Sequence, residues 1–192
     1  MESHWSRLFR KGVLAIAFSG AVLLSGLLYS LFWVAPEGDE GKQWLVHWRP
    51  LLLRNAWTQT PEISPETLLE WQGQGLSVWL VDVRSDEEQV VSMIAGAMTR
   101  DEYVARRASE QPDRVVAYCT LGIRSGHWVD EHQTPDVPMY NLAGGIVGWT
   151  HVAGPLVEPG RKRGRDSQPS TRRIHVQGEF WNLVAEGYDA VW

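Results

Sequence analysis

The residue best suited to covalent chemistry in this chain is Cys119, the only cysteine among its 192 residues. It ends an apolar, β-branched run, and the chain continues as Thr-Leu-Gly-Ile-Arg-Ser-Gly over residues 120–126. This order predicts a strand, a short loop and a helix start, which together aim backbone N–H groups and a positive helix end at one point. A thiol held there should lose its proton more easily, so Cys119 is predicted to be a nucleophile.

Other uses of this cysteine are weaker. A free cysteine is often a small buried side chain, but that role requires neither a glycine-bearing loop nor a nearby arginine. Metal binding needs more thiols or a tight histidine cluster, so the sequence predicts no metal and no cofactor. A disulfide within the chain is impossible with one cysteine.

The elements that must position Cys119 alternate between strands and helices, which predicts an α/β domain. Strands are predicted at 78–83, 114–118 and 137–141, and helices from Pro65, which Ser64 caps, and at 86–91, 99–110, 125–132 and 146–152. Such alternation implies parallel strands joined by right-handed crossovers. Ligands of parallel sheets collect beyond the carboxyl ends of the strands, and Cys119 and Asp82 both lie at such ends.

Three stretches of the sequence have a recognisable order. Residues 80–84 read Leu-Val-Asp-Val-Arg and precede Glu87-Glu88 and Ile94-Ala95-Gly96-Ala97; the second stretch is residues 116–125, and the third is residues 141–149. They resemble, in order, the entry motif, the active-site loop and the closing L-x-G-G-x-x-x-W motif of the rhodanese family, and they cover about residues 57–155. The resemblance implies a five-stranded, mostly parallel sheet flanked by helices, and a sulfurtransferase whose loop cysteine carries a persulfide.

This chemistry assigns a role to each residue of the loop. Cys119 is expected to attack the outer sulfur of an anionic donor such as thiosulfate, which needs positive potential around it. The substrate-binding residues are then Thr120, Leu121, Gly122, Ile123 and Arg124. Loop-supporting roles are predicted for Asp82, Arg84 and Ser125. Asp82 should anchor the loop, with proton transfer as the alternative, and Arg84 should form a structural ion pair.

Details of the motifs bear on the substrate. Residues 93–96 read Met-Ile-Ala-Gly where the family usually has His-Ile-Pro-Gly, and Gln89 stands where an aromatic residue is usual. Related cysteine phosphatases and arsenate reductases use a Cys-x5-Arg loop. Arg124 follows Cys119 by five positions, and this shorter Cys-x4-Arg loop resembles that of the sulfur-handling members. A non-catalytic binding module and a redox-sensing thiol remain alternatives.

Charge is unevenly distributed along the chain. Residues 57–157 carry six arginines and fourteen Asp or Glu residues, a net charge of −8, which argues against nucleic acid as a partner. Residues 161–173 carry six positive charges and one negative charge, mixed with Gly, Ser and Pro, as is typical of a solvated linker. Docking of this segment onto the acidic domain or onto anionic headgroups is the alternative.

Residues 12–35 form a stretch of 24 residues without a charge. At about 1.5 Å per residue, a helix of this length exceeds the roughly 30 Å hydrocarbon core of a bilayer. Basic residues precede it and acidic residues follow it, which predicts a single-pass anchor in the inner (cytoplasmic) membrane, with the cysteine domain facing the periplasm or exterior. A cleaved signal peptide is the alternative, although the stretch is longer than a usual signal core.

These patterns divide the chain into six parts. They are a cytoplasmic segment at 1–11, a transmembrane anchor at 12–35, a juxtamembrane linker at 36–56, a rhodanese-like domain at 57–157, a basic linker at 158–173 and a C-terminal extension at 174–192. Residues 44–53, rich in Trp and Leu, are expected either to lie at the membrane interface or to pack against the domain. The expected partners are a small sulfur-containing anion as donor, a thiol, cyanide or protein as acceptor, and the membrane through residues 12–35.

Overall fold

The computed structural model describes residues 20, 22–30, 38–53, 60–159 and 169–192. The chain divides into two compact units, residues 1–34 and residues 35–192. In the first unit, residues 22–30 are helical. Within the described residues, no helix is long and apolar enough to cross a bilayer. Most of the anchor predicted at 12–35 lies outside them.

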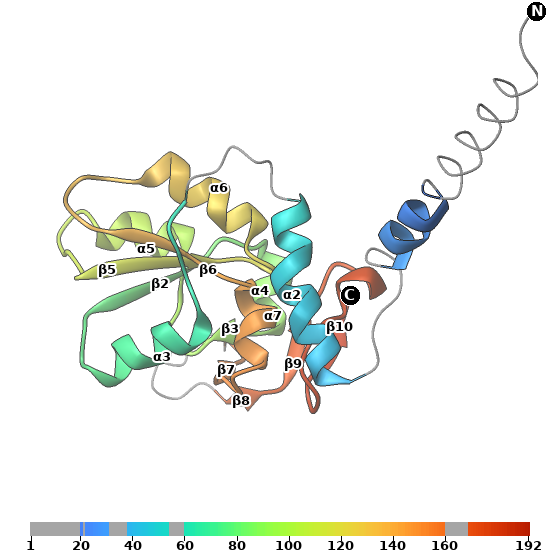
Figure 1. Ribbon diagram of the computed structural model, residues 1–192. Helices are drawn as coiled ribbons and strands as arrows, with labels where there is room; N and C mark the ends of the chain where they lie inside the picture. The colour runs from blue at the N-terminus through green and yellow to red at the C-terminus, as the bar shows by residue number, and fades with distance from the viewer. Residues whose placement is uncertain (1–19, 21, 31–37, 54–59, 160–168) are drawn as a thin grey trace, which may run out of the picture. The chain divides into compact units, whose positions relative to one another are not determined.

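The second unit is built on a five-stranded parallel sheet with the strand order β1-β6-β5-β2-β4 (Figure 1). The strands are β1 (Glu62–Ile63), β2 (Val78–Asp82), β4 (Met98–Thr99), β5 (Arg114–Tyr118) and β6 (Met139–Leu142). Strand β5 is central, and its Val116 pairs with Leu80 of β2 and Tyr140 of β6. Since the strands are parallel, the carboxyl ends of β2, β5 and β6 meet at one edge of the sheet, where Cys119 follows β5.

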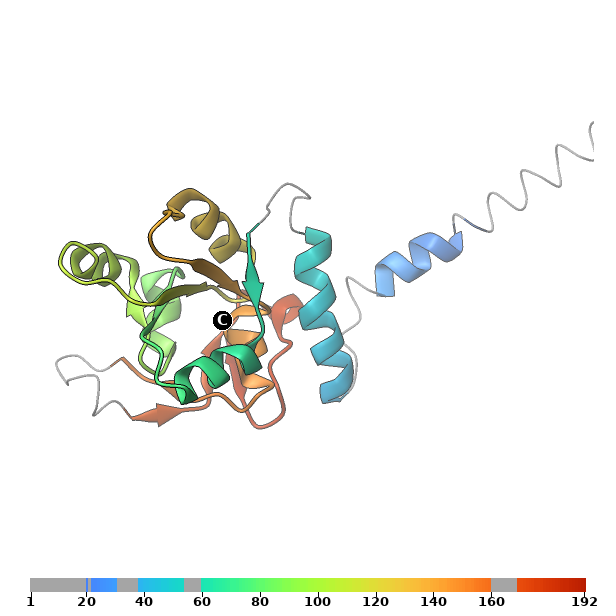
Figure 2. The same ribbon diagram turned by 60° about the vertical axis from the view of Figure 1, so that its left-hand side comes forward.

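Helices cover both faces of this sheet (Figures 1 and 2). The helices are α3 (Pro65–Gly73), α4 (Asp86–Val91), α5 (Arg100–Arg106), α6 (Ile123–His132) and α7 (Gly145–Thr150). Successive side chains of a strand point to opposite faces. Leu80 and Val116 accordingly pack in the cluster that contains residues of α3 and α7, whereas Val81 and Ala117 pack with α5 and α6. Burial of both faces explains why the strands read as continuous apolar runs.

Two smaller sheets, absent from the elements predicted above, bring the C-terminal segment into the same unit. One is antiparallel with the order β3-β7-β8, and the other pairs β9 with β10 in parallel. Their strands are β3 (Met93–Ile94), β7 (Leu156–Val157), β8 (Ser170–Thr171), β9 (Arg173–His175) and β10 (Asp189–Val191). Residues 170–173 therefore lie largely in strands rather than in a linker, while residues 160–168 lie outside the described part. Ile174, Val176 and Leu183 are fully buried in the main core, so residues 174–192 belong to the domain.

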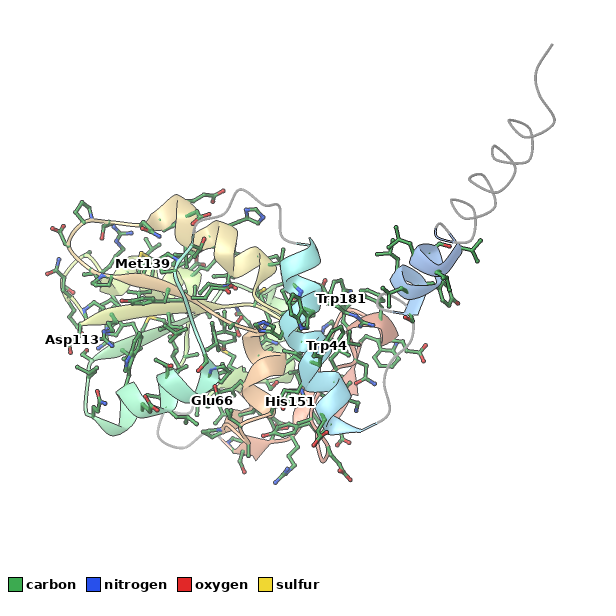
Figure 3. All side chains as sticks on the ribbon, in the orientation of Figure 1. Trp44, Glu66, Asp113, Met139, His151 and Trp181 are labelled. Atoms are coloured by element: carbon green, nitrogen blue, oxygen red, sulfur yellow. The ribbon has the colours of Figure 1, made fainter. Side chains whose placement is uncertain are left out.

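Helix α2 (Asp39–Leu53) occupies most of the range predicted as a linker at 36–56. Its Leu45 and Val46 are only 4% and 5% exposed and join the main core. Trp44 and Trp48 lie on the outer side of the helix, with ring centroids 6.0 Å apart (Figure 3 labels Trp44). The helix separates its apolar side chains onto two faces, and one of these faces packs against the domain. Packing against the domain is one of the two arrangements predicted for residues 44–53.

The ends of two helices differ from the predicted ones. The side chain of Thr99 accepts the Glu102 N–H and the Glu102 carboxylate accepts the Thr99 N–H, so α5 starts where the capping pattern predicts. It ends at Arg106, four residues before the predicted end at 110, and the chain continues in turns. Helix α6 begins at Ile123, two residues before the predicted start at 125, because Gly122 already serves as its N-cap.

Candidate active site

Cys119 lies between the end of β5 and the start of α6. Its side chain is nearly buried, and its sulfur accepts the N–H of Gly122 at 3.2 Å. Gly122 has a φ of +94°, and a Cβ there would lie 3.2 Å from the carbonyl oxygen of Leu142, so the turn requires glycine. The thiol therefore lies at the N-terminus of the ten-residue helix α6, where backbone N–H groups favour a negative charge.

The Gly144-Gly145 turn of the closing motif holds the other side of this loop. The N–H groups of Ile146 and Val147 donate to the carbonyl oxygens of Cys119 and Thr120 at 2.9 and 3.2 Å. Gly145 has a φ of +56°, and a Cβ there would lie 2.7 Å from the Thr120 carbonyl oxygen and closer still to that of Cys119. The motif thus fixes the carbonyl groups of the loop by a close backbone approach.

Asn141 of β6 joins the loop to helix α6. The hydroxyl of Ser125 donates to Asn141 Oδ1 at 2.6 Å, and the Asn141 amide donates to the Gly122 carbonyl at 3.0 Å and to Glu62 at 2.7 Å. Ser125 therefore lies where a loop-supporting residue would act. Sequence reasoning assigns no role to Asn141, although it is a polar residue in an apolar strand and the first residue of the third stretch.

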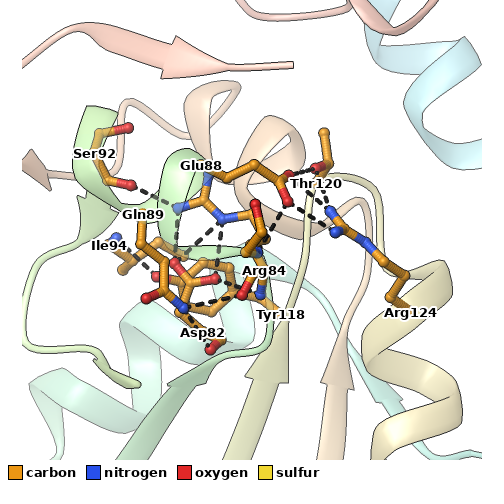
Figure 4. A network of polar contacts seen from close by, with 10 residues as sticks. Asp82, Arg84, Glu88, Gln89, Ser92, Ile94, Tyr118, Thr120 and Arg124 are labelled. Atoms are coloured by element: carbon orange, nitrogen blue, oxygen red, sulfur yellow. Dashed lines mark hydrogen bonds and ion pairs between the residues drawn. The ribbon is translucent and has the colours of Figure 1, made fainter. Parts of the chain in front are cut away.

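Arg124 forms a two-pronged ion pair with Glu88 of α4 (Figure 4). The two nitrogen–oxygen distances are 2.8 and 2.7 Å. The hydroxyl of Thr120 donates to Glu88 at 2.9 Å and accepts from Arg124 at 3.0 Å, so three side chains form one cluster. Burial alone would raise the pKa of Glu88, but the hydrogen bonds from Arg124, the Ser85 N–H and Thr120 lower it to about 2. The pKa of Arg124 is raised by its hydrogen bond to Glu88 and by the nearby Cys119 sulfur, although burial acts in the opposite direction.

A second ion pair, between Asp82 and Arg84, is fully buried near the end of β2 (Figure 4). Nε and Nη2 of Arg84 lie 3.0 and 2.7 Å from the carboxylate, and Nη2 also donates to the Ser92 carbonyl at 2.6 Å. Burial would lower the pKa of Arg84, but Asp82 raises it above its ordinary value. Arg84 thus lies in an ion pair, as expected. The Asp82 carboxylate binds Arg84 rather than the backbone of residues 120–124, because the guanidinium offers it charge-assisted hydrogen bonds.

Gln89 binds next to the buried pair of Asp82 and Arg84. The resemblance to the rhodanese family predicts an aromatic residue at this position. The Gln89 side-chain amide donates to the carbonyl oxygens of Asp82 and Arg84 at 3.1 and 3.2 Å. Tyr118, directly before Cys119, is buried and accepts the Ile94 N–H at 3.1 Å, and burial raises its pKa well above the ordinary value. Gln89 thus supports the main chain at Asp82 and Arg84 through hydrogen bonds that an aromatic side chain would not make.

A pocket of about 190 Å³ reaches the thiol. It is lined by Cys119, Thr120, Leu121, Ile123, Arg124, Gln177 and Trp181. The loop residues of this set all belong to the predicted site, but Gly122, which the sequence also predicts as substrate-binding, does not line the pocket. Gln177 and Trp181 come from the C-terminal segment and carry no sequence signal for this role. In the described part of the chain, no three His, Cys, Asp or Glu side chains are grouped so that they could hold a metal ion.

A match to a known protein family agrees with this architecture. Residues 64–151 match the family model of the rhodanese-like domain, a span of just under half the chain that contains all three motifs. With the five-stranded parallel sheet and its flanking helices, this match confirms the rhodanese-like α/β fold predicted from the motifs. No curated protein matches the chain.

Several solved structures are similar to part of the chain. A thiosulfate sulfurtransferase from Pseudomonas aeruginosa is 22% identical over 51% of this chain, with a TM-score of 0.46, and the match spans only 19% of that protein. A rhodanese-related protein from Thermoplasma volcanium is 22% identical over 50% of this chain and 97% of its own, with a TM-score of 0.42. A rhodanese-like domain protein from Staphylococcus aureus is 24% identical over 46% of this chain and 90% of its own, with a TM-score of 0.39.

Proposed function

We propose that this protein is a rhodanese-type sulfurtransferase that moves sulfane sulfur from a donor such as thiosulfate to a thiophilic acceptor through a persulfide on Cys119. The observation that carries the proposal is the position of the thiol. Its sulfur accepts the Gly122 N–H at the start of α6 and lies in a pocket lined by the residues that follow it. The motif match over residues 64–151 supports the same activity.

In the first step, the thiolate of Cys119 attacks the outer sulfur of the donor. A new sulfur–sulfur bond forms, the sulfur–sulfur bond of thiosulfate breaks, and its electron pair leaves with sulfite. The Gly122 N–H already donates to the sulfur, and together with the N-terminus of α6 it stabilises the anions on both sides of this step. The Cys119 persulfide anion that results keeps the same donors.

In the second step, a nucleophilic acceptor attacks the outer sulfur of the persulfide. The sulfur–sulfur bond to Cys119 breaks, and the thiolate is regenerated. Dividing the transfer between two displacements replaces one difficult step by two easier ones. The thiol, cyanide or protein expected as acceptor meets this requirement, and neither step needs a metal or a cofactor.

Arg124 has a restricted role in this scheme. Its guanidinium lies beside the thiol but is paired with Glu88, so the two charges nearly cancel next to the thiol. An anionic donor therefore has to compete with Glu88 for the guanidinium. Backbone N–H groups, which carry no counter-charge, supply the rest of the anion binding.

The test is intact mass spectrometry of the full-length protein in a non-ionic detergent after thiosulfate treatment and desalting. The wild type should gain one sulfur and release it to cyanide as thiocyanate. Cys119→Ser should gain none while keeping its fold, because the change is close to isosteric. A wild-type protein without added sulfur, or thiocyanate production that persists in Cys119→Ser, would refute the proposal.

We also propose that residues 12–35 anchor the protein in the inner membrane, with the catalytic domain on the periplasmic or exterior side. The support is the length of the uncharged stretch and the basic residues before it. Exposed Trp44 and Trp48 on α2 are of a residue type that favours the membrane interface. A reporter enzyme that works only in the periplasm should be active when fused after Trp192. Activity of a reporter that works only in the cytoplasm, fused at the same position, would overturn the orientation.

A further inference from the structure

The C-terminal segment provides one wall of the pocket at Cys119. Trp181 belongs to the short 3-10 helix Glu179–Trp181, more than fifty residues after the loop, yet it lines the same pocket as the thiol (Figure 3 labels Trp181). No feature of the rhodanese-like motif requires this wall, because the match ends at residue 151. The wall therefore comes from a segment outside the residues that match the family model.

This wall is held firmly. Arg49 of α2 donates a hydrogen bond to the carbonyl oxygen of Phe180, and its guanidinium lies 4.2 Å from the centre of the Phe180 ring. The Phe180 and Trp181 rings are in edge contact, with centroids 4.7 Å apart. The following residue pair, Leu183 and Val184, is buried in the main core. The Trp181 ring is therefore positioned before any ligand binds, so its contact with a ligand costs little ordering entropy.

The free surface of the pocket is chiefly apolar. Thr120 and Arg124 use their polar atoms in the cluster with Glu88. The remaining loop side chains in the lining, Leu121 and Ile123, are apolar, and they line the pocket together with Trp181. The volume of about 190 Å³ exceeds the roughly 150 Å³ that is enough to bind benzene in an apolar cavity. The pocket is large enough for an aromatic ring or a short alkyl chain attached to a reacting sulfur.

We propose that Trp181 determines acceptor specificity, so that the preferred acceptor is a small thiol with an apolar body; this inference rests on the proposed sulfurtransferase activity. A dianion such as thiosulfate gains nothing from an apolar wall, so the wall serves the second half of the reaction. The acceptor thiol loses its proton to solvent, and its thiolate attacks the outer sulfur of the Cys119 persulfide. The bond to Cys119 breaks, and the product leaves as an organic persulfide.

Alkylation of the thiol tests the pocket without depending on sulfur transfer. Because Cys119 is the only cysteine, its modification is read directly by intact mass spectrometry of the full-length protein. N-phenylmaleimide and N-methylmaleimide react with thiols by the same chemistry. The rate of Cys119 with the phenyl compound divided by its rate with the methyl compound, normalised to the same ratio for a small free thiol, measures the preference of the pocket for an aromatic group. The wild type should prefer the phenyl compound about tenfold, as expected when a ring is removed from water.

Matched variants assign this preference to one side chain. Trp181→Ala should bring the ratio close to that of the free thiol, and Trp181→Phe should retain most of it. Trp192→Ala, at an exposed position in the same segment, should leave it unchanged. An unchanged ratio in Trp181→Ala, equal losses in Trp181→Ala and Trp192→Ala, or a Cys119 that reacts with neither compound would overturn the assignment of the pocket.

Turnover with two acceptors tests specificity in the reaction. With thiosulfate as donor, the ratio of kcat/KM for thiophenol over cyanide should fall about tenfold in Trp181→Ala, chiefly through a higher KM for thiophenol. The same ratio in wild type and variant would refute the role in specificity. A wild type that transfers sulfur to neither acceptor refutes the proposed function, whereas an unchanged maleimide ratio in Trp181→Ala refutes the pocket, so the two failures are distinguishable.

Discussion

The ion pair between Glu88 and Arg124 should give the protein a stability contribution that depends on acidic pH. We consider Glu88→Gln, which removes one charge. The Ser85 N–H and the Thr120 hydroxyl donate to different oxygens of the Glu88 carboxylate, and the single oxygen of glutamine can keep the first of these bonds. Glutamine is also accepted at the third position of a capping box, where Glu88 lies. The substitution therefore resembles protonation of the Glu88 carboxyl group, which also leaves one carbonyl oxygen and no charge.

The magnitude follows from the pKa of this group. The pKa of Glu88 falls from 4.5 to about 2 in the folded protein. At about 1.4 kcal/mol for each unit, this corresponds to roughly 3 kcal/mol at neutral pH. The Glu88 side chain is buried, but that of Arg124 is 40% exposed, and screening by solvent reduces the expected value to about 1–2 kcal/mol.

The sign is fixed by the direction of the shift. Because the folded-state pKa is lowered, the contribution is fully present above the unfolded pKa of 4.5 and is lost as the pH falls through about 2. The wild type should therefore exceed Glu88→Gln in stability by about 1–2 kcal/mol at pH 7, and the difference should vanish near pH 2.

Urea denaturation of the full chain in a non-ionic detergent, followed at several pH values between 7 and 2, measures this difference. Glu70→Gln, at an exposed position of α3, is the matched control and should follow the wild type throughout. Stability curves of wild type and Glu88→Gln that run parallel over the whole range would refute the reasoning, because the ion pair would then contribute nothing that depends on protonation of Glu88.

Three further predictions concern the loop. Arg124→Ala should lower kcat/KM with thiosulfate by about 2–4 kcal/mol of transition-state stabilisation, since the Glu88 carboxylate loses its partner and then opposes an anionic donor, and an unchanged rate would exclude Arg124 from donor binding. Gly145→Ala should destabilise the fold by about 2–5 kcal/mol, because its Cβ would collide with the Thr120 carbonyl at a positive φ. Gly73→Ala has open space around it and should shift the urea midpoint little, so equal shifts would contradict this argument. The wild type should not hydrolyse aryl phosphates, because the short loop leaves little room for in-line attack on phosphorus; turnover that Cys119→Ser abolishes would make the protein a phosphatase.

Local sequence patterns were sufficient for much of the fold. The apolar runs that became β2, β5 and β6 are short and continuous because both of their faces are buried, and this depends only on residue type and spacing. The capping residues Ser64 and Thr99 start α3 and α5 as predicted, since a cap acts over three residues. The strands of the smaller sheets have two or three residues each, too few to give a periodic signal.

The candidate site divides in the same way. The sequence alone determined the strand, loop and helix start around Cys119, because Cys119, Gly122 and the start of α6 lie within a few residues of each other and their geometry is local. It could not determine that Glu88, 31 positions before Cys119, pairs with Arg124, or that Asn141 holds the Gly122 carbonyl. The partner of a charged or polar side chain depends on which elements lie side by side.

The C-terminal segment makes this dependence clearest. Composition separates residues 174–192 from the domain by a basic stretch, and the sequence therefore predicts an extension of unknown role. Tertiary packing instead buries Ile174, Val176 and Leu183 in the main core and brings Trp181 to the thiol. The reason is physical: burial of apolar side chains favours compact packing without regard to separation along the chain, so only the folded structure decides which distant side chain forms the wall of the pocket.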